Sequence, residues 1–248
     1  MNFLKIVKHD FINIMHNPAL VISNTILPLI LIAVLGFVTQ NNFGTDPISA
    51  YDYQSVNMLI LSVALIVAIT TSNAFMEEKV MRGNMRIAYA PVSKTEIILS
   101  KIVSSYVFVS ICYGMLIPFC QYILGLNMGG SNFLWFTLLL NVFSFFECCF
   151  GAMFCCIFRS EEQANSIMQI PLFIFIFLGG ILVRIHRLGT VVNMISNISP
   201  VKWVVGCSYQ IIYDNDLHLM LPIIVSLASL SLICLLVCGL RFKPEEYV

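Results

Sequence analysis

Six long apolar runs alternate with shorter polar intervals along the chain. They cover approximately residues 19–38, 56–75, 102–124, 133–158, 167–183 and 219–240. Each run is near the ~20 residues that a helix needs to cross the hydrocarbon core of a bilayer. The pattern therefore predicts six transmembrane helices, the fifth of them short. Prolines lie within or at the start of four runs, as Pro28, Pro118, Pro171 and Pro222, and membrane helices tolerate them when neighbours satisfy the freed carbonyls.

The residues before the first run form a separate pattern. Phe3, Val7, Phe11 and Ile14 recur at helical spacing, and charged residues such as Lys8 lie between them. This predicts an N-terminal helix over residues 1–18 that lies in the membrane interface. The alternative is a charged extension of the first span.

Composition supports an all-α membrane protein that forms one transmembrane domain over residues 1–248. Hydrophobic residues make up 59% of the chain and charged residues only 10%, which leaves too little polar surface to cover a water-soluble globule. The formal net charge is zero and no block of lysine or arginine occurs, so binding to nucleic acid is not expected.

The placement of basic residues predicts the orientation in the membrane. If the N-terminus is cytoplasmic, ten of the 13 lysines and arginines lie inside, and only Arg184, Arg187 and Lys202 lie outside. Both termini and the polar interval 77–101 are then cytoplasmic. The external interval 184–218 contains apolar residues around a break at Ser199 and Pro200, which predicts a re-entrant or interfacial hairpin of two short helices.

The interval 77–101 is the one long charged segment between apolar runs, and it predicts a folded elbow. Its first part has an apolar helical ribbon and a charged one, formed by Met81, Met85 and Ala88 and by Glu78, Arg82 and Arg86. Pro91 then disfavours helix at Ala90. Ser93 and Glu96 match a capping box, so a second helix is expected to begin near Lys94.

Glu147 is the one ionisable residue in the middle of an apolar run. A small and polar helical stripe surrounds it, formed by Asn141, Ser144, Cys148, Gly151 and Cys155. Such a stripe is expected to face protein or a water-filled cavity rather than lipid. Asn141, Ser144 and Glu147 are therefore candidates for a cargo pathway, with Glu147 as a cargo contact or a proton-linked group. The alternative is a protonated carboxyl group that is hydrogen-bonded to a neighbouring helix.

Cysteine usage and enzyme motifs indicate no catalytic or metal site. Eight of the nine cysteines fall inside apolar runs, where packing is a better interpretation than disulfides or metal binding. The chain contains no P-loop motif, no H-E-x-x-H and no G-x-S-x-G, so ATP-driven work requires a partner.

Glu77, Glu78 and Arg82 fit the E-E-x-x-x-R pattern of intramembrane proteases of the CAAX-processing type, but the later histidine motifs of those enzymes are missing. This protease class remains the enzyme alternative. A secondary transporter, for which inverted repeats would be expected, is a further alternative.

Read as a whole, the chain resembles ABC transporter permeases of the type 2 exporter family. The resemblance rests on the N-terminal helix, the six runs, the acidic pair and amphipathic segment after the second run, Pro171 opening the fifth run, and the sequence Ile198-Ser199-Pro200 ahead of Trp203. One departure is Gly83-Asn84-Met85-Arg86, where the family often has Gly-Thr-Leu-Glu.

The resemblance implies a half-transporter that pairs with a second permease chain, identical or similar, and with separate cytoplasmic P-loop ATPase subunits that bind ATP and Mg. The segment with Glu78, Met81, Arg82, Met85, Arg86 and Ala88 would be the coupling helix. The alternative is an ordinary helix resting on lipid headgroups.

The expected cargo is amphipathic or hydrophobic, namely a peptide, a lipid-like molecule or a drug. Compact permeases of this kind resemble those that export peptides or protect bacteria against their own bacteriocins, which implies a bacterial cytoplasmic membrane. No cofactor is expected in the chain itself.

Overall fold

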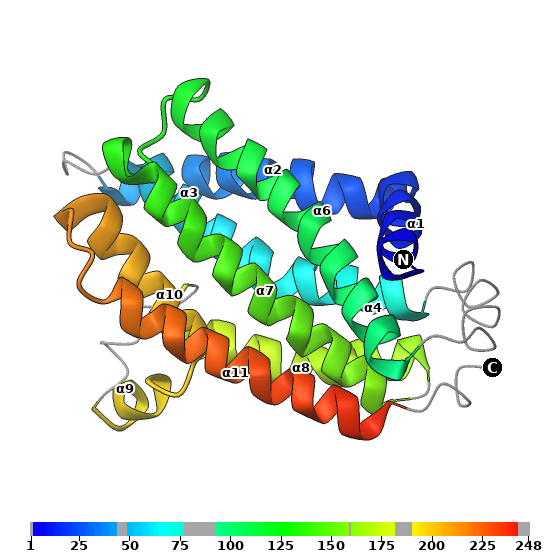
Figure 1. Cartoon of the computed structure of the whole chain (residues 1–248). Helices are drawn as coiled ribbons and strands as arrows, with labels where there is room; N and C mark the ends of the chain where they lie inside the picture. The colour runs from blue at the N-terminus through cyan, green and yellow to red at the C-terminus, as the bar shows by residue number, and fades with distance from the viewer. Residues whose placement is uncertain (1, 44–48, 77–92, 159, 182–189, 243–248) are drawn as a thin grey trace.

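The computed structural model describes residues 2–43, 49–76, 93–158, 160–181 and 190–242, and every element within these ranges is helical. Long helices run side by side, and shorter helices lie at the two ends of the bundle (Figure 1). The elements are α1 (Asn2–His16), α2 (Pro18–Phe43), α3 (Ala50–Ser62), η1 (Val63–Val67), α4 (Ala68–Met76), α6 (Lys94–Tyr122), η2 (Gly130–Asn132), α7 (Phe133–Ile157), α8 (Glu161–Gly179), α9 (Thr190–Ser196), α10 (Pro200–Tyr209), η4 (Gln210–Asp214) and α11 (Met220–Arg241).

Five helical stretches in the described ranges are long and apolar enough to cross a membrane. They are Pro18–Gln40, Ala50–Met76, Lys94–Tyr122, Gly130–Ile157 and Met220–Arg241. The predicted fifth run corresponds to α8, which has only 19 residues and begins with polar turns at Glu161 and Glu162. The multi-pass architecture therefore agrees with the sequence, and the sixth crossing stays a prediction.

The helix that contains the fifth apolar run begins upstream of that run, so Pro171 lies near the start of the run but not at the start of the helix. It lies inside α8, which begins at Glu161 behind the cap residue Ser160. The Gln163 amide donates a hydrogen bond to Ser160 Oγ over 3.3 Å. Because this cap starts the helix upstream of the apolar run, the run alone could not locate the first turn.

The second span and α7 form the centre of the bundle. Within the most apolar window of each span, the buried share is 72% for the second span and 67% for the span that contains α7. The corresponding share is 22% for both α2 and α11. The second span is continuous from Ala50 to Met76 and contains a π-helical segment, η1. α7 packs directly against η1 and α4. α2 and α11 therefore form the periphery, where apolar side chains can face lipid.

A tight turn separates α6 from α7, in the gap between the third and fourth apolar runs. Gly125, Gly129 and Gly130 have positive φ angles of 69°, 105° and 54°. Glycine adopts this backbone conformation without the steric penalty that a side chain brings. The turn is also tied to the second span, because the Asn127 amide donates a 2.8 Å hydrogen bond to Asp52 Oδ1.

The described part of the interval 184–218 contains two short helices, α9 and α10, with a break at Ser199 and Pro200. Ser199 caps α10, and its hydroxyl also donates to the Phe175 carbonyl of α8 over 2.7 Å. α10 packs closely on α8, since a β-carbon at Gly179 would lie 2.6 Å from Val201 Cγ1. α10 is thus part of the packed bundle, and its depth in a membrane stays a prediction.

The N-terminal helix α1 is separate from the first span and packs mainly on α6. Figure 1 shows α1 at the same end of the bundle as the start of α6 and the end of α11. The face of α1 that meets the bundle includes Ile14 and Asp10, whose exposed fractions are 3% and 2%. Burial raises the pKa of Asp10 above its usual range, and the nearby Lys101 and His9 oppose this shift.

Lys101 of α6 connects three helices at this end. Its side chain is only 2% exposed. Its ammonium Nζ lies 3.9 Å from Asp10 Oδ2 of α1 and donates a 2.7 Å hydrogen bond to the Ala74 carbonyl of α4. It also lies 5.7 Å from the centre of the Phe75 ring. One cation therefore holds α1, α4 and α6 together.

The bundle predicts a labelling pattern in intact cells. Ser49, before α3, and Ser131, in η2, are exposed and lie at one end of the spans, whereas the exposed Ser93 lies at the other. With the N-terminus inside, single cysteines at positions 49 and 131 should react with a membrane-impermeant thiol reagent, and a cysteine at position 93 should not. The nine native cysteines are buried, so the unmodified chain serves as the background control. Labelling at position 93 in intact cells would show that the orientation is the opposite of the one predicted.

The contacts of Lys101 predict a large loss of stability on its removal. Lys101→Met would leave the Asp10 carboxylate buried without its partner, and breaking a buried pair costs about 3 to 5 kcal/mol. The matched control is Lys94→Met, because Lys94 is exposed in the first turn of the same helix. Thermal unfolding in detergent should show a clear fall in melting temperature for Lys101→Met only. Asp10→Asn combined with Lys101→Met should recover part of the loss, and equal melting temperatures for Lys101→Met and Lys94→Met would refute this role.

Candidate functional site

The predicted coupling residues lie outside the described part of the chain. Glu78, Met81, Arg82, Met85, Arg86 and Ala88 all belong to the interval 77–92, so the structure says nothing of their arrangement. What the structure does describe is the attachment of this interval at both ends. It follows α4, which ends at Met76, and precedes α6, which begins at Lys94.

The start of α6 has the capping box that the sequence predicts. The Glu96 amide donates to Ser93 Oγ over 3.3 Å, and the Ser93 amide donates to Glu96 Oε2 over 3.0 Å. These reciprocal bonds satisfy two amides that a helix start leaves without partners. The second half of the elbow is therefore a well-defined helix start.

Lys101 secures both ends of the elbow. Ala74 and Phe75 stand just before the end of α4, and Lys101 lies two turns into α6. Since Lys101 contacts both residues, α4 and α6, which precede and follow the interval 77–92 in the chain, are joined to each other. Sequence reasoning placed Lys101 inside the elbow but missed its partner Asp10. The available signal was an aspartate among the apolar positions of an amphipathic N-terminal helix.

The predicted small and polar stripe of α7 lies inside the protein. Ser144, Glu147, Cys148, Gly151 and Cys155 are buried, and Asn141 is half-buried. A β-carbon at Gly151 would lie 2.5 Å from the Ala68 carbonyl oxygen, so the backbones of α7 and α4 approach closely there. Small residues permit this approach between membrane helices.

Glu147 is fully buried, and neither of its carboxylate oxygens has a hydrogen-bond partner among the described residues. The polar neighbours on its stripe make their bonds within α7. Ser144 Oγ donates to the Leu140 carbonyl, and Asn141 Nδ2 donates to the Thr137 carbonyl. The hydrogen-bonded partner on another helix, which one interpretation of the sequence expected, is thus not found in this part of the chain. An ionised carboxyl in such surroundings would cost several kcal/mol.

The opposite end of the bundle contains a column of three tyrosines that sequence reasoning missed. The rings of Tyr53 and Tyr209 stack at 5.6 Å between centres, and those of Tyr209 and Tyr213 at 5.8 Å. The Tyr209 hydroxyl donates to Asn57 Oδ1 over 2.8 Å, which joins α10 to α3. Burial raises the pKa of Tyr213 to about 12, with further contributions from the nearby Asp52 and Tyr53. The Tyr213 hydroxyl is neutral at physiological pH. Tyrosines four residues apart in one helix were the signal for this column.

Lys202 holds α9 against α10 at the same end. Its ammonium group donates to Ser196 Oγ over 2.6 Å and to Asn193 Oδ1 and Asn197 Oδ1, both over 2.9 Å. Trp203 adds a 2.7 Å hydrogen bond from its indole N–H to the Asn197 carbonyl. The three donors of a lysine are thereby used, so Lys202 supports the hairpin rather than offering a free charge.

The cysteine pairs of α7 are packed in the interior. Cys148, Cys149, Cys155 and Cys156 are all buried. Among the residues placed by the structure, no group of three histidine, cysteine, aspartate or glutamate side chains could hold a metal ion.

Comparison with known proteins agrees with this architecture. A family model described as ABC-2 type transporter matches residues 1–213, from α1 into η4. No curated protein matches the chain. The matched region contains the N-terminal helix, four of the five helical stretches that are long and apolar enough to cross a membrane, the interval 77–101, and the short helices α9 and α10. The chain therefore belongs to the ABC-2 type transporter family.

Proposed function

We propose that the chain is the membrane-spanning half of an ATP-driven exporter. The family match over residues 1–213 is the observation that carries the proposal. The protein would act with a second permease chain, identical or similar, and with two cytoplasmic P-loop ATPase subunits. ATP and Mg would bind to those subunits, because the chain has no nucleotide-binding motif of its own. The match favours transport over the intramembrane-protease alternative.

The elbow would be the contact with the ATPase. Met81, Met85 and Ala88 would enter an apolar groove of that subunit, and Arg82 and Arg86 would pair with acidic groups at its rim. Support comes from the described ends of the elbow, which Lys101 joins to each other and to α1. A segment held this way can transmit motion of the ATPase to the second and third spans.

The cargo would be an amphipathic or hydrophobic molecule, in one form a peptide or bacteriocin whose export protects a bacterium. Few charged residues lie in the spans, and the polar residues Asn141 and Ser144 precede Glu147 on the same stripe of α7. A path beside this stripe would open only when α7 separates from η1 and α4, because these elements are packed together in the present structure. Glu147, which has no described hydrogen-bond partner, would then contact the cargo.

The coupling proposal predicts the effect of two new carboxylates in the elbow. Replacing both Met81 and Met85 by Asp would bury charge in a desolvated groove and should weaken binding of the ATPase by several kcal/mol. Lys94→Asp is the matched control, since it makes the same change of two charge units at an exposed position beside the elbow. The measurement is co-purification of the ATPase together with cargo-dependent ATP turnover. Normal values of both for the double variant would show that the segment is only an interfacial helix.

The burial of Glu147 predicts a separation of stability from transport. Glu147→Leu replaces a buried carboxyl without partners by an apolar group, which should maintain or raise the melting temperature. If Glu147 contacts cargo, the same variant should lose transport by tenfold or more, and Glu147→Gln should retain a larger part of it. Transport in vesicles and thermal unfolding of both variants give the comparison. Full transport by the Glu147→Leu variant would show that Glu147 is not part of the cargo pathway.

A further inference from the structure

We propose that the groove between α2 and α6 binds one acyl chain of an anionic membrane phospholipid. The groove is defined by Thr25, Ile26, Phe108, Cys112, Met115 and Phe119, and it has a volume of about 340 Å³. This volume is within the range of about 300 to 1,000 Å³ that is usual for small-molecule pockets. The inference does not depend on the proposed transport function.

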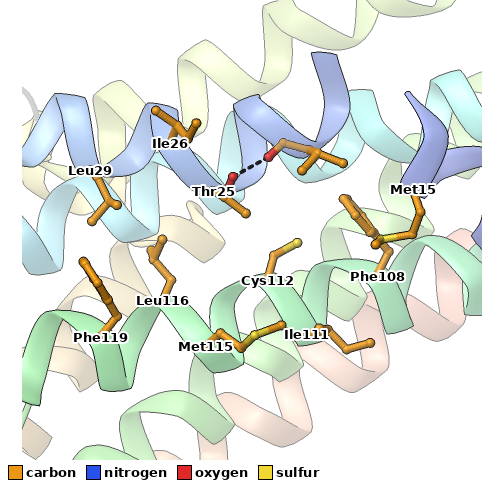
Figure 2. A pocket seen from close by; sticks show the side chains of 11 residues that line it. Met15, Thr25, Ile26, Leu29, Phe108, Ile111, Cys112, Met115, Leu116 and Phe119 are labelled. Carbon is orange, nitrogen blue, oxygen red and sulfur yellow. Dashed lines mark hydrogen bonds between the residues drawn. The ribbon is translucent and has the colours of Figure 1, made fainter. Parts of the chain in front are cut away.

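The chemistry of the groove fits a hydrocarbon chain. Figure 2 shows side chains of α2 and α6 facing each other across the gap, and Thr25 is the one hydroxyl among them. Thr25 Oγ1 donates a 2.6 Å hydrogen bond to the Val21 carbonyl of its own helix. Its hydroxyl proton is therefore already used. A polar ligand would lose its hydrogen bonds with water and gain few in return, whereas a hydrocarbon chain loses none.

The shape and position of the groove also fit a lipid. Its wall on α6 extends from Phe108 to Phe119, a length of about 16 Å at the rise of an α-helix. Both helices are membrane-crossing elements, and Ile26 and Met115 at the groove are 48% and 65% exposed. A chain lying parallel to the two helices would cover these side chains, and it can enter directly from the bilayer.

The charge on α1 selects an anionic headgroup. Met15, near the end of α1, lines the groove. The exposed side chains of α1 include Lys5, Lys8, His9 and His16, whereas its one acidic residue, Asp10, is buried. Lysines at a membrane surface attract anionic lipids by about 1 kcal/mol each. A phosphate group above the groove would thus meet a basic surface with no exposed carboxylate on the same helix.

The test uses phosphatidylglycerol with a photoreactive diazirine in its acyl chain, added to phosphatidylcholine nanodiscs that contain the full chain. Mass spectrometry then maps the labelled peptides. We expect labelling of residues 21–29 and 108–119 to exceed that of the outer face of α11 by fivefold or more. Leu232 and Leu236 of that face are 58% and 59% exposed, so they report ordinary contact with surrounding lipid.

Two variants fill the groove from opposite walls. Cys112→Trp and Thr25→Phe should each lower labelling of the groove at least fivefold and leave labelling of α11 unchanged. Val225→Trp, on the exposed face of α11, is the matched control and should leave the groove signal intact. Thr25→Phe keeps the test valid if the larger tryptophan prevents folding.

A second arm tests the headgroup. The same diazirine chain on phosphatidylcholine should label the groove several-fold less than the phosphatidylglycerol probe does. Replacing Lys5 and Lys8 by Gln should bring groove labelling by the two lipids close to equal. Equal labelling of the groove and α11, or labelling that the filling variants do not change, would overturn the site. Equal labelling by the two lipids in the unmodified protein would overturn its preference for anionic lipid. Direct crosslinks between two copies through α2 and α6 would assign the groove to a second chain instead.

Discussion

One buried ammonium group sets the geometry of the end of the bundle that bears the elbow. Lys101 lies in α6, faces Asp10 of α1 and donates to the backbone of α4 at Ala74. A buried charge without partners has a high free-energy cost. The three helices can therefore separate only if Lys101 becomes exposed to solvent or stays buried without its partners. The N-terminal helix, the end of the second span and the start of the third are therefore held as one unit.

This unit contains the two helices that precede and follow, in the chain, the segment for which coupling to an ATPase is proposed. Movement of the elbow would be passed to the second span, which is the most buried span and contains the π-helical segment η1. α7 packs on η1 and α4 through Gly151, so displacement of the second span must alter the contacts around Glu147. At the opposite end, the tyrosine column and the contacts of Lys202 hold α3, α9 and α10 together. The fold thus combines two well-bonded ends with a close backbone approach of α7 to α4 at Gly151 between them.

Much of this architecture could be predicted from apolar runs and local signals. Ser93 and Glu96 located the start of α6, and the gap between the third and fourth apolar runs located the turn before α7. The burial of Ser144, Cys148 and Gly151 followed from their common helical face. Local patterns could not reveal pairings between distant residues, which is why the contacts of Asp10 with Lys101 and of Tyr209 with Asn57 were missed. The start of α8 was missed because a polar cap and polar first turns precede its apolar run. The coupling residues in the interval 77–92 rest on sequence and family alone.

Because Lys101 joins α1 to the start of α6, the two helices should move as a single unit when the proposed ATPase hydrolyses ATP. This can be measured as the distance between spin labels at two exposed positions, Leu4 of α1 and Thr95 of α6, in the proposed complex with the ATPase and with one labelled permease chain per complex. We expect the same distance distribution in the nucleotide-free and the vanadate-trapped state, and a broader distribution after Lys101→Met. A shift of the distance with nucleotide in the unmodified protein would show that the two helices move separately and that Lys101 does not hold them as one unit.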